Sequence, residues 1–440
     1  MARQLFGTDG IRGVAGEPPL DDPTVYAAGR ALGELVRRID PHPEVLIGMD
    51  TRESGRRLAE LVAGGLERTG VPARFAGVLP TPGLAYLTHC GPFFAGVMIS
   101  ASHNPYRDNG IKVFAHSGFK LPDEQEEQVE EGIRRLEGET VSSRMLQADP
   151  SMPQQYINHL VSSGGAIEGA GLAAVVVDCA NGAACAVASR LFERLGVTAE
   201  IIADRPNGRN INLECGSMHL DALRRRVLET GAGLGVAFDG DADRALFVTA
   251  SGREVNGDAV LWMAARHFGV KQVISTTMAN LGLEKALAAR GVSLVRTPVG
   301  DKYVLEEMVR RDAELGGEQS GHVIFRRWAT TGDGLLTALK VLEIMAASGR
   351  SLDALVEDLP VYPQVIRNVA VKARTPLEEA PEVAGAIRAA QAALAGRGRV
   401  IVRYSGTEPL IRVMVEADTA DQVERHAGAL VAVITERLGA

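Results

Sequence analysis

The 440-residue sequence lacks long hydrophobic runs. Its longest apolar stretches, such as 172–177 and 429–434, are far shorter than the roughly 20 residues of a membrane-spanning helix. The first residues contain no apolar segment of the kind found in secretory signals. We therefore expect no membrane partner and a cytoplasmic location.

Cysteine is also scarce in this chain. The four cysteines, at positions 90, 179, 185 and 215, include no CxxC pair. This spacing argues against a zinc site or a dithiol redox motif, and it favours reduced thiols in the cytoplasm.

An excess of positive charge is absent as well. The net charge is −8 and the isoelectric point is about 5.7, so the composition shows no basic footprint for nucleic acid. The sequence contains no Walker loop, no Gly-x-Ser-x-Gly elbow and no His-Glu-x-x-His motif. ATP is therefore not an expected cosubstrate.

What the sequence does contain is a repeated alternation of strand and helix patterns. A chain of 440 residues is too long for a single core, so we expect two to four domains. Three rounds of strands and helices are followed by a smaller α+β pattern, which places domains at 1–150, 151–252, 253–363 and 364–440. The first three are expected to be similar layered α/β domains, with functional loops at the carboxyl ends of strands.

A hydroxyl-rich turn follows an apolar strand pattern at 93–99. It reads Ser-Ala-Ser-His-Asn-Pro over 100–105, and Lys112 follows after ten residues. Pro105 disfavours helix at the preceding residue, and Asn109-Gly110 predicts a second turn. Taken alone, this pattern also suits a strand followed by an ordinary polar loop.

Three aspartates follow another apolar strand pattern, at 234–238. Asp239, Asp241 and Asp243 would lie on one side of an extended backbone. Three hard oxygen donors suit Mg²⁺, which takes few carboxylates together with a phosphate oxygen. A calcium loop is excluded because its sixth and twelfth positions would be arginine and alanine instead of glycine and glutamate. A plain acidic turn is the alternative.

Four motifs occur in order along the chain. They are Ser-Ala-Ser-His-Asn-Pro (100–105), Asp-Gly-Asp-Ala-Asp-Arg (239–244), Gly-Glu-Gln-Ser-Gly-His (317–322) and Arg-Tyr-Ser-Gly-Thr-Glu-Pro (403–409). This series resembles that of the α-D-phosphohexomutases, from about residue 3 to the C-terminus. The N-terminal Phe-Gly-Thr-Asp-Gly-Ile-Arg-Gly (6–13) and the third motif are similar to the members that act on glucosamine phosphates. The resemblance implies an α/β fold in which three domains with mixed sheets and the smaller α+β domain surround a central cleft.

The resemblance implies a phosphoserine enzyme that isomerises a small phosphosugar. Ser102 would carry the phosphoryl group, and one Mg²⁺ would be held by Ser102 with Asp239, Asp241 and Asp243. Glucosamine 6-phosphate and glucosamine 1-phosphate would interconvert through glucosamine 1,6-bisphosphate, which would also act as an activator. The product would supply UDP-N-acetylglucosamine and peptidoglycan precursors. We expect a monomer or a homodimer.

The resemblance also assigns supporting roles. His103 would orient the serine loop, with simple packing in the loop as the alternative. Arg244 would organise the loop, and Lys112 and His322 would assist the sugar hydroxyl. A guanidinium with hydroxyls and backbone N–H groups suits phosphate, which makes the fourth motif a predicted phosphate cradle. The residues expected to bind the substrate are Glu318, Ser320, Arg403, Ser405, Gly406, Thr407, Arg12 and Lys302. Thr8 and Arg52 are expected at the rim of the site.

Other activities remain open on the same motifs. A phosphomannomutase or phosphoglucomutase would use the same machinery. A metal-dependent phosphosugar phosphatase would instead let water take the phosphoryl group. A non-catalytic phosphosugar sensor is disfavoured because the serine and the three aspartates are all present.

Overall fold

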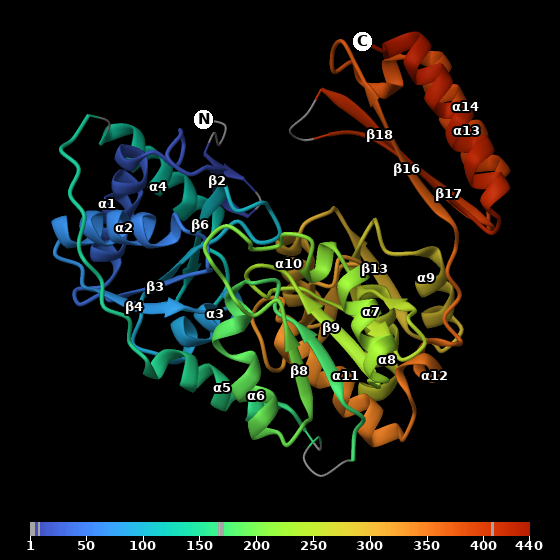
Figure 1. The fold of residues 1–440 in the computed structure, drawn as a ribbon. Coiled ribbons are helices and arrows are strands. Elements are labelled where there is room, and N and C mark those ends of the chain that lie inside the picture. Colours follow the sequence, from blue (N-terminus) through green and yellow to red (C-terminus); the bar gives the residue numbers. More distant parts are fainter. Residues whose placement is uncertain (1–4, 8, 137, 166, 168–170, 406–408) are drawn as a thin grey trace. The chain divides into compact units, whose positions relative to one another are not determined.

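The computed structural model describes all residues except 1–4, 8, 137, 166, 168–170 and 406–408. It divides into two compact units (Figure 1). The first comprises Met1–Met278 with Gly291–Asp358, and the second comprises Ala279–Arg290 with Leu359–Ala440.

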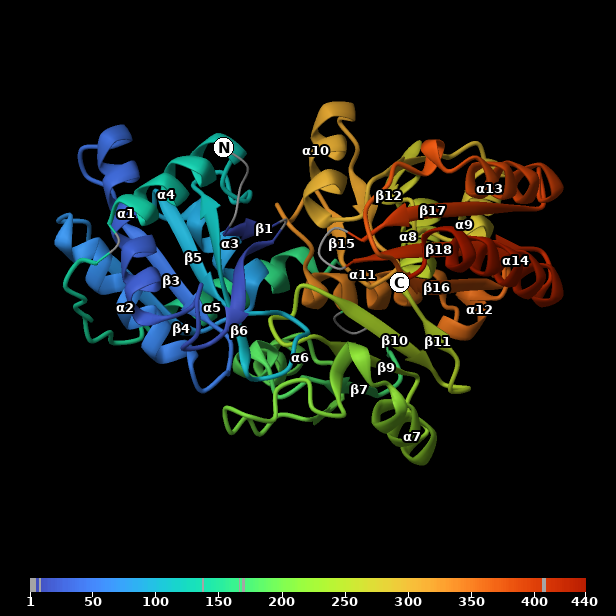
Figure 2. The same cartoon turned by 90° about the horizontal axis from the view of Figure 1, so that it is seen from above.

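The first sheet has the strand order β1-β2-β6-β5-β3-β4. Its strands are β1 (Phe6–Gly7), β2 (Gly10–Val14), β3 (Val45–Met49), β4 (Ala73–Val78), β5 (Ala95–Ile99) and β6 (Asp108–Ala115). Helices α1 (Asp22–Ile39), α2 (Gly55–Arg68) and α4 (Asp123–Arg135) cover one face (Figure 2). Helix α3 (Thr81–Cys90) packs on the other face, against the two strand glycines at 48 and 96. Strand β5 is therefore buried on both sides, which explains why its sequence is apolar throughout.

The second sheet has the order β11-β10-β9-β7-β8. Its strands are β7 (Val175–Asp178), β8 (Ala199–Ile202), β9 (Leu234–Phe238), β10 (Ala245–Thr249) and β11 (Glu254–Val255). The helices of this part are α5 (Ser151–Ser163), α6 (Ala188–Arg194) and α7 (Asp221–Thr230), with the short 3₁₀ helices η1 (Ala183–Ala186) and η2 (Gly216–Met218).

The third sheet has the order β13-β12-β14-β15. Its strands are β12 (Gln272–Thr276), β13 (Ser293–Thr297), β14 (Leu315–Gly317) and β15 (Val323–Phe325). The associated helices are α8 (Gly257–Phe268), α10 (Asp301–Arg311), α11 (Gly334–Ser348) and α12 (Leu352–Val356). Asn256 and Asp333 begin α8 and α11 by accepting hydrogen bonds from Ala259 N (3.3 Å) and Leu336 N (2.9 Å), as N-cap side chains do.

These three sheets repeat one strand arrangement. In each, the first of four strands lies between the second and third and is parallel to both, while the fourth pairs antiparallel with the third. The repeats are β3–β6, β7–β10 and β12–β15. The predicted similarity of three α/β domains is confirmed by this shared topology, and the mixed pairing confirms the mixed sheets.

The second unit is the smaller α+β part. Its antiparallel sheet has the order β16-β18-β17, formed by β16 (Gln364–Ala370), β17 (Gly398–Tyr404) and β18 (Leu410–Ala417). Its helices are α9 (Leu281–Ala288), η3 (Leu377–Glu379), α13 (Pro381–Ala393) and α14 (Ala420–Leu438). Helix α9 joins this unit because Leu281 N donates to Glu416 Oε1 at 2.9 Å.

The structure departs from the sequence-based expectations in several places. Helices α3, α5, α10 and α12 are not predicted by the sequence patterns. The predicted turn at Asn109-Gly110 is wrong, because both residues lie in β6 and pair with β2. Glycine is needed there for close approach and not for a turn, since a Cβ on Gly110 would lie 2.6 Å from Ser100 O.

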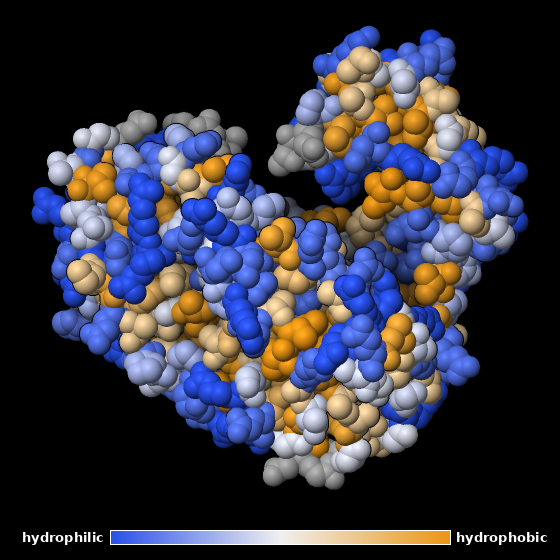
Figure 3. Space-filling view, in the orientation of Figure 1, coloured by the Kyte–Doolittle hydropathy of each residue, from blue (hydrophilic) through white to orange (hydrophobic). Residues whose placement is uncertain are grey.

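The described helices include none that is long and apolar enough to cross a membrane. On the face shown in Figure 3, hydrophobic residues form patches that hydrophilic residues separate.

Candidate active site

Ser102 follows β5 in a loop with left-handed backbone geometry, at φ 53°. Its Oγ donates a hydrogen bond of 2.6 Å to Asp239 Oδ2 and lies 3.3 Å from His103 Nδ1. The side chain of Ser102 is buried. Its hydroxyl therefore faces the aspartate loop between β9 and β10.

Ser100 has a different environment, although it is only two residues away. Its Oγ donates to Asp50 Oδ2 at 2.6 Å and accepts from Ser102 N at 3.0 Å. Ser100 is completely buried. It supports the loop from within the first α/β part, whereas Ser102 reaches across to the second.

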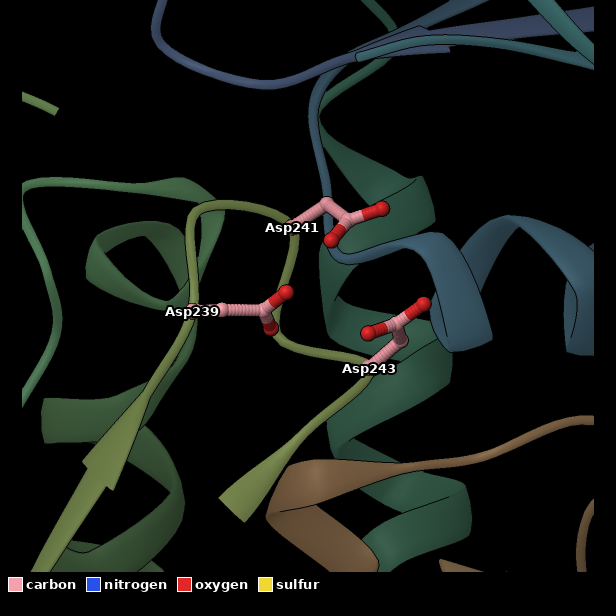
Figure 4. A group of neighbouring side chains, drawn as sticks. All are labelled: Asp239, Asp241 and Asp243. Atoms are coloured by element: carbon pink, nitrogen blue, oxygen red, sulfur yellow. The ribbon is translucent and has the colours of Figure 1, made fainter. Parts of the chain in front are cut away.

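The three aspartates lie close together at the carboxyl end of β9 (Figure 4). Each offers a carboxylate oxygen, and these oxygens lie within 4.8 Å of one another. The expectation of an extended backbone is wrong, because the loop turns tightly and Ala242 has φ 57°. The turn, and not strand alternation, gathers Asp239, Asp241 and Asp243.

Donors occupy part of this carboxylate group and leave part of it open. Thr81 Oγ1 and Lys112 Nζ donate to Asp241 Oδ2 at 2.6 and 2.9 Å. The second oxygens of Asp241 and Asp243, both Oδ1, have no hydrogen-bond partner among the described residues. Buried carboxylates with unpartnered oxygens fit a divalent cation that prefers oxygen ligands.

The electrostatics of the group follow from its burial and its like charges. Burial raises the pKa of Asp239 well above its ordinary value, and the nearby carboxylates of Asp243 and Asp241 raise it further. Burial would lower the pKa of Lys112, but Asp241, Asp9 and Asp243 together raise it. A bound cation would relieve the repulsion among the three aspartates.

The histidines and the arginine of the motifs surround this group. His322 Nε2 accepts from Gly332 N at 3.0 Å, which places the ring proton on Nδ1, 3.5 Å from Asp243 Oδ2. Burial lowers the pKa of His103 to about 4, with further lowering by Arg244 and Arg12. The backbone N–H of Arg244 donates to Asp239 Oδ1 at 3.2 Å.

The third motif lies in the loop between β14 and β15. Glu318 Oε1 accepts from Gly300 N at 3.2 Å, and Ser320 Oγ lies 3.5 Å from Glu318 Oε2. Lys302 forms an ion pair with Asp123. A cavity of about 680 Å³ opens beside these groups, and its lining includes Lys120, Asp301, Lys302 and His322.

Comparisons with known proteins agree with this arrangement. Models of the phosphoglucomutase/phosphomannomutase family match four segments: alpha/beta/alpha domain I at 3–139, domain II at 154–252, domain III at 256–362 and the C-terminal domain at 367–433. The phosphoglucosamine mutase of Solibacter usitatus is 54% identical to this chain, and the match covers 100% of both chains. The chain belongs to the phosphoglucosamine mutase family.

Two solved structures of phosphohexomutases share the fold. A phosphoglucomutase/phosphomannomutase family protein from Burkholderia thailandensis has a TM-score of 0.81 at 25% identity, over 98% of this chain and 97% of that one. The N-acetylphosphoglucosamine mutase of Aspergillus fumigatus, solved with GlcNAc-6P and magnesium, has a TM-score of 0.69 at 18% identity, over 99% and 96%. As a member of the phosphoglucosamine mutase family, this chain is an isomerase.

The predicted phosphate cradle of this phosphohexomutase belongs to the second unit. Arg403 lies in β17 opposite Arg412 of β18. Ser405 is buried, and its N–H donates to Leu410 O at 2.8 Å. Gly406 and Thr407 lie outside the described residues, as does Thr8.

Several residues that contact the predicted site residues were not singled out in the sequence. Asp9 forms ion pairs with Arg12, Lys112 and Lys120, and the last two distances are 3.1 and 2.6 Å. Asp9 could have been found, because it stands inside the N-terminal motif at 6–13. Thr81 begins α3 and gives no sequence signal, since its role depends on the tertiary contact with Asp241.

The expectation that Arg52 lies at the rim is wrong. Its side chain is fully buried and bonded to backbone carbonyl groups of the serine loop. A residue so placed acts on the loop and not on a ligand.

Proposed function

We propose that the enzyme interconverts glucosamine 6-phosphate and glucosamine 1-phosphate through a phosphorylated Ser102. The observation that best supports this proposal is the hydrogen bond from Ser102 Oγ to Asp239. It lies beside carboxylate oxygens of Asp241 and Asp243 that have no hydrogen-bond partner among the described residues. The 54% identity to a phosphoglucosamine mutase supports the choice of substrate.

In the first half-reaction, a sugar hydroxyl oxygen attacks the phosphorus of phospho-Ser102. The bond between phosphorus and Ser102 Oγ breaks, and a new phosphorus–oxygen bond forms on the sugar, giving glucosamine 1,6-bisphosphate. The proton of the attacking hydroxyl ends on Ser102 Oγ, which leaves as a serine hydroxyl. Lys112 and His322 lie at the carboxylate group and are the candidates to assist the sugar hydroxyl. Phosphoryl transfer of this kind depends mainly on positioning and on charge neutralisation.

The residues that would hold one Mg²⁺ are Ser102, through its phosphate, and Asp239, Asp241 and Asp243. When bound, the ion neutralises negative charge on the phosphoryl group. The fold shared with the Aspergillus enzyme, whose structure contains magnesium, supports this assignment. His103 and Arg244 keep the two loops in place from either side, as their contacts with Ser102 and Asp239 suggest.

In the second half-reaction the bisphosphate has turned, and its other phosphoryl group returns to Ser102. Glu318 and Ser320 would bind the sugar hydroxyls, because a carboxylate and a hydroxyl can accept from adjacent ring O–H groups. The phosphate that is not transferred would be held by Arg403, Ser405, Gly406 and Thr407. Arg12 and Lys302 would add positive charge for the substrate. Added bisphosphate would restore enzyme that had lost the Ser102 phosphate, and so act as an activator.

The proposed setting is the bacterial cytoplasm, where the product would supply UDP-N-acetylglucosamine and peptidoglycan precursors. All four cysteines are free, as is usual in a reducing compartment. We infer a monomer or a homodimer, which sedimentation of the purified enzyme would decide.

A competition assay tests the proposal. Purified enzyme with Mg²⁺ and a trace of bisphosphate would receive the 1-phosphates of glucosamine, glucose and mannose together. We expect the highest kcat/KM for glucosamine 1-phosphate. Preference for mannose or glucose would reassign the substrate, and release of inorganic phosphate without isomerisation would indicate a phosphatase.

A further inference from the structure

Arg52 holds the backbone of the serine loop through its carbonyl oxygens. Its Nη2 donates to Ser102 O and Asn104 O, both at 2.9 Å. Its Nη1 donates to Asp108 O at 3.0 Å and also to Pro105 O. One guanidinium therefore binds four carbonyl groups between Ser102 and Asp108, a task for which its planar fork of N–H donors is suited.

Arg52 is itself fixed by a buried carboxylate. Its Nε donates to Asp50 Oδ2 at 2.9 Å, and neither side chain is exposed. The same carboxylate accepts from Ser100 Oγ, which in turn accepts from Ser102 N. The N–H and the carbonyl of Ser102 are thus both tied to the Asp50–Arg52 pair.

Asn212 reaches the same loop from the second α/β part. Its Nδ2 donates to Ser102 O at 2.9 Å and to Asn104 O at 3.1 Å. Asn212 has φ 58°, a left-handed geometry that asparagine tolerates better than most residues. Gly240 of the aspartate loop packs on the same carbonyl, since a Cβ there would lie 2.6 Å from Ser102 O.

We propose that Arg52 and Asn212 are positioning residues that together fix the Ser102 carbonyl, and through it the direction of Ser102 Oγ. This inference rests on the proposed function. The left-handed backbone of Ser102 is unfavourable for a serine and persists only where its surroundings hold it. Two donors from different α/β parts meet at one oxygen, so they also tie the serine loop to the second α/β part.

This arrangement separates catalysis from substrate binding. Arg52 is fully buried and has no access to a sugar, so its loss leaves the substrate contacts in place. A misplacement of about 1 Å in a reacting group can lower the rate roughly 100-fold. Weakening the contacts of Arg52 and Asn212 with the Ser102 carbonyl should therefore lower kcat and leave KM nearly unchanged.

The variants for the test are Arg52→Lys and Asn212→Asp. Lysine keeps the positive charge beside Asp50 but lacks the planar fork for four carbonyl groups. Aspartate keeps the size and the left-handed tolerance of Asn212, but it places a carboxylate against two carbonyl oxygens. Thr51→Val is the matched control, because Thr51 Oγ1 donates to Asn181 O at 2.6 Å and so links the same two parts without binding the serine loop.

We expect kcat for glucosamine 6-phosphate to fall about 10- to 100-fold in both variants, with KM within about twofold of wild type. The double variant should be little worse than the more severe single one, since both residues act on one carbonyl. Hydrogen exchange of the 100–110 segment, measured without substrate, should be faster in both variants and unchanged in Thr51→Val.

The outcomes separate this inference from the proposed function. A wild-type enzyme that does not isomerise glucosamine phosphates would overturn the proposed function, while the exchange measurement would still report on the loop. Normal kcat in both variants, or equal losses in Thr51→Val, would overturn the positioning role. If Arg52→Lys does not fold, Asn212→Asp decides the question alone.

Discussion

Ser100 and Ser102 have the same side chain but different contacts, because the backbone directs their hydroxyls differently. The backbone turn at Ser102 sends its hydroxyl toward Asp239, whereas Ser100 points back to Asp50. Their chemistry is identical, so only the direction of the hydroxyl separates the proposed phosphoryl carrier, Ser102, from the supporting residue Ser100.

Ser102→Ala should abolish isomerisation, because it removes the oxygen that we propose carries the phosphoryl group. Ser100→Ala should keep the phosphate and lose activity only in part, since it breaks a supporting hydrogen bond of the loop. Intact mass and peptide mapping of both variants would check this. Phosphate on Ser100 in the wild type would contradict the assignment.

Asp241→Asn should weaken Mg²⁺ binding by at least about tenfold and lower activity accordingly. The change removes the negative charge of a carboxylate whose Oδ1 has no hydrogen-bond partner among the described residues. It also removes a counterion of Lys112. Binding of Mn²⁺ followed by electron paramagnetic resonance gives a readout besides activity. An unaltered affinity of the variant for the metal, or full wild-type activity in excess chelator, would contradict a metal site at these aspartates.

Among the elements, the same connection holds residues of the candidate site in each of the three α/β repeats. In each repeat of the α/β pattern, the loop from the third strand to the antiparallel fourth holds a motif: the serine loop after β5, the aspartates after β9, and Glu318 with Ser320 after β14. The first two loops meet, as the hydrogen bond between Ser102 and Asp239 shows.

Gly257→Ala should disturb the third of these loops selectively. Gly257 is the first residue of α8, and a Cβ there would lie 1.9 Å from Glu318 O, so the loop must move. We expect KM for the sugar phosphate to rise about tenfold or more, with normal phosphate content on Ser102. Gly428→Ala in α14 is the control, because its Cβ would meet no atom within 4 Å. An unchanged KM for Gly257→Ala would contradict a substrate role for this loop.

At the scale of the whole molecule, buried polar contacts join the α/β parts of the first unit. Asp333 begins α11, and its Oδ2 accepts from the hydroxyl of Tyr156 in α5 at 2.8 Å. Burial raises the pKa of Asp333 to about 6, despite hydrogen bonds from Leu336 N and Tyr156 that lower it. Ionisation of this group therefore opposes the folded state.

The pH dependence of stability follows from this shift. Because the pKa of Asp333 is higher in the folded protein than near 3.8 in the unfolded chain, its stabilising effect is complete below about pH 4 and is lost as the pH rises through about 6. The loss is on the order of 3 kcal/mol. Asp333→Asn keeps a capping oxygen, and the Tyr156 hydroxyl can accept from its amide.

Asp333→Asn should therefore gain stability relative to wild type between pH 4 and pH 7. Thermal unfolding of both proteins at several pH values would show the difference in Tm growing with pH. Parallel profiles would mean that Asp333 is not the group that titrates.

The amino-acid sequence by itself determined the class of the protein and most of its elements. Local pattern was enough for β9, whose predicted limits at 234–238 match the structure, because an apolar run is a property of neighbouring residues. The four motifs identified the family, since each keeps its chemistry within a few consecutive residues.

Only the tertiary structure decided how these residues meet. It showed that a turn gathers the three aspartates, that Thr81 joins them, and that Arg52 is buried behind the serine loop. Thr81 and Asp241 are 160 residues apart in the sequence, and Asn212 and Ser102 are 110 residues apart. Such contacts depend on how separate sheets pack, and no local pattern in the chain carries that information.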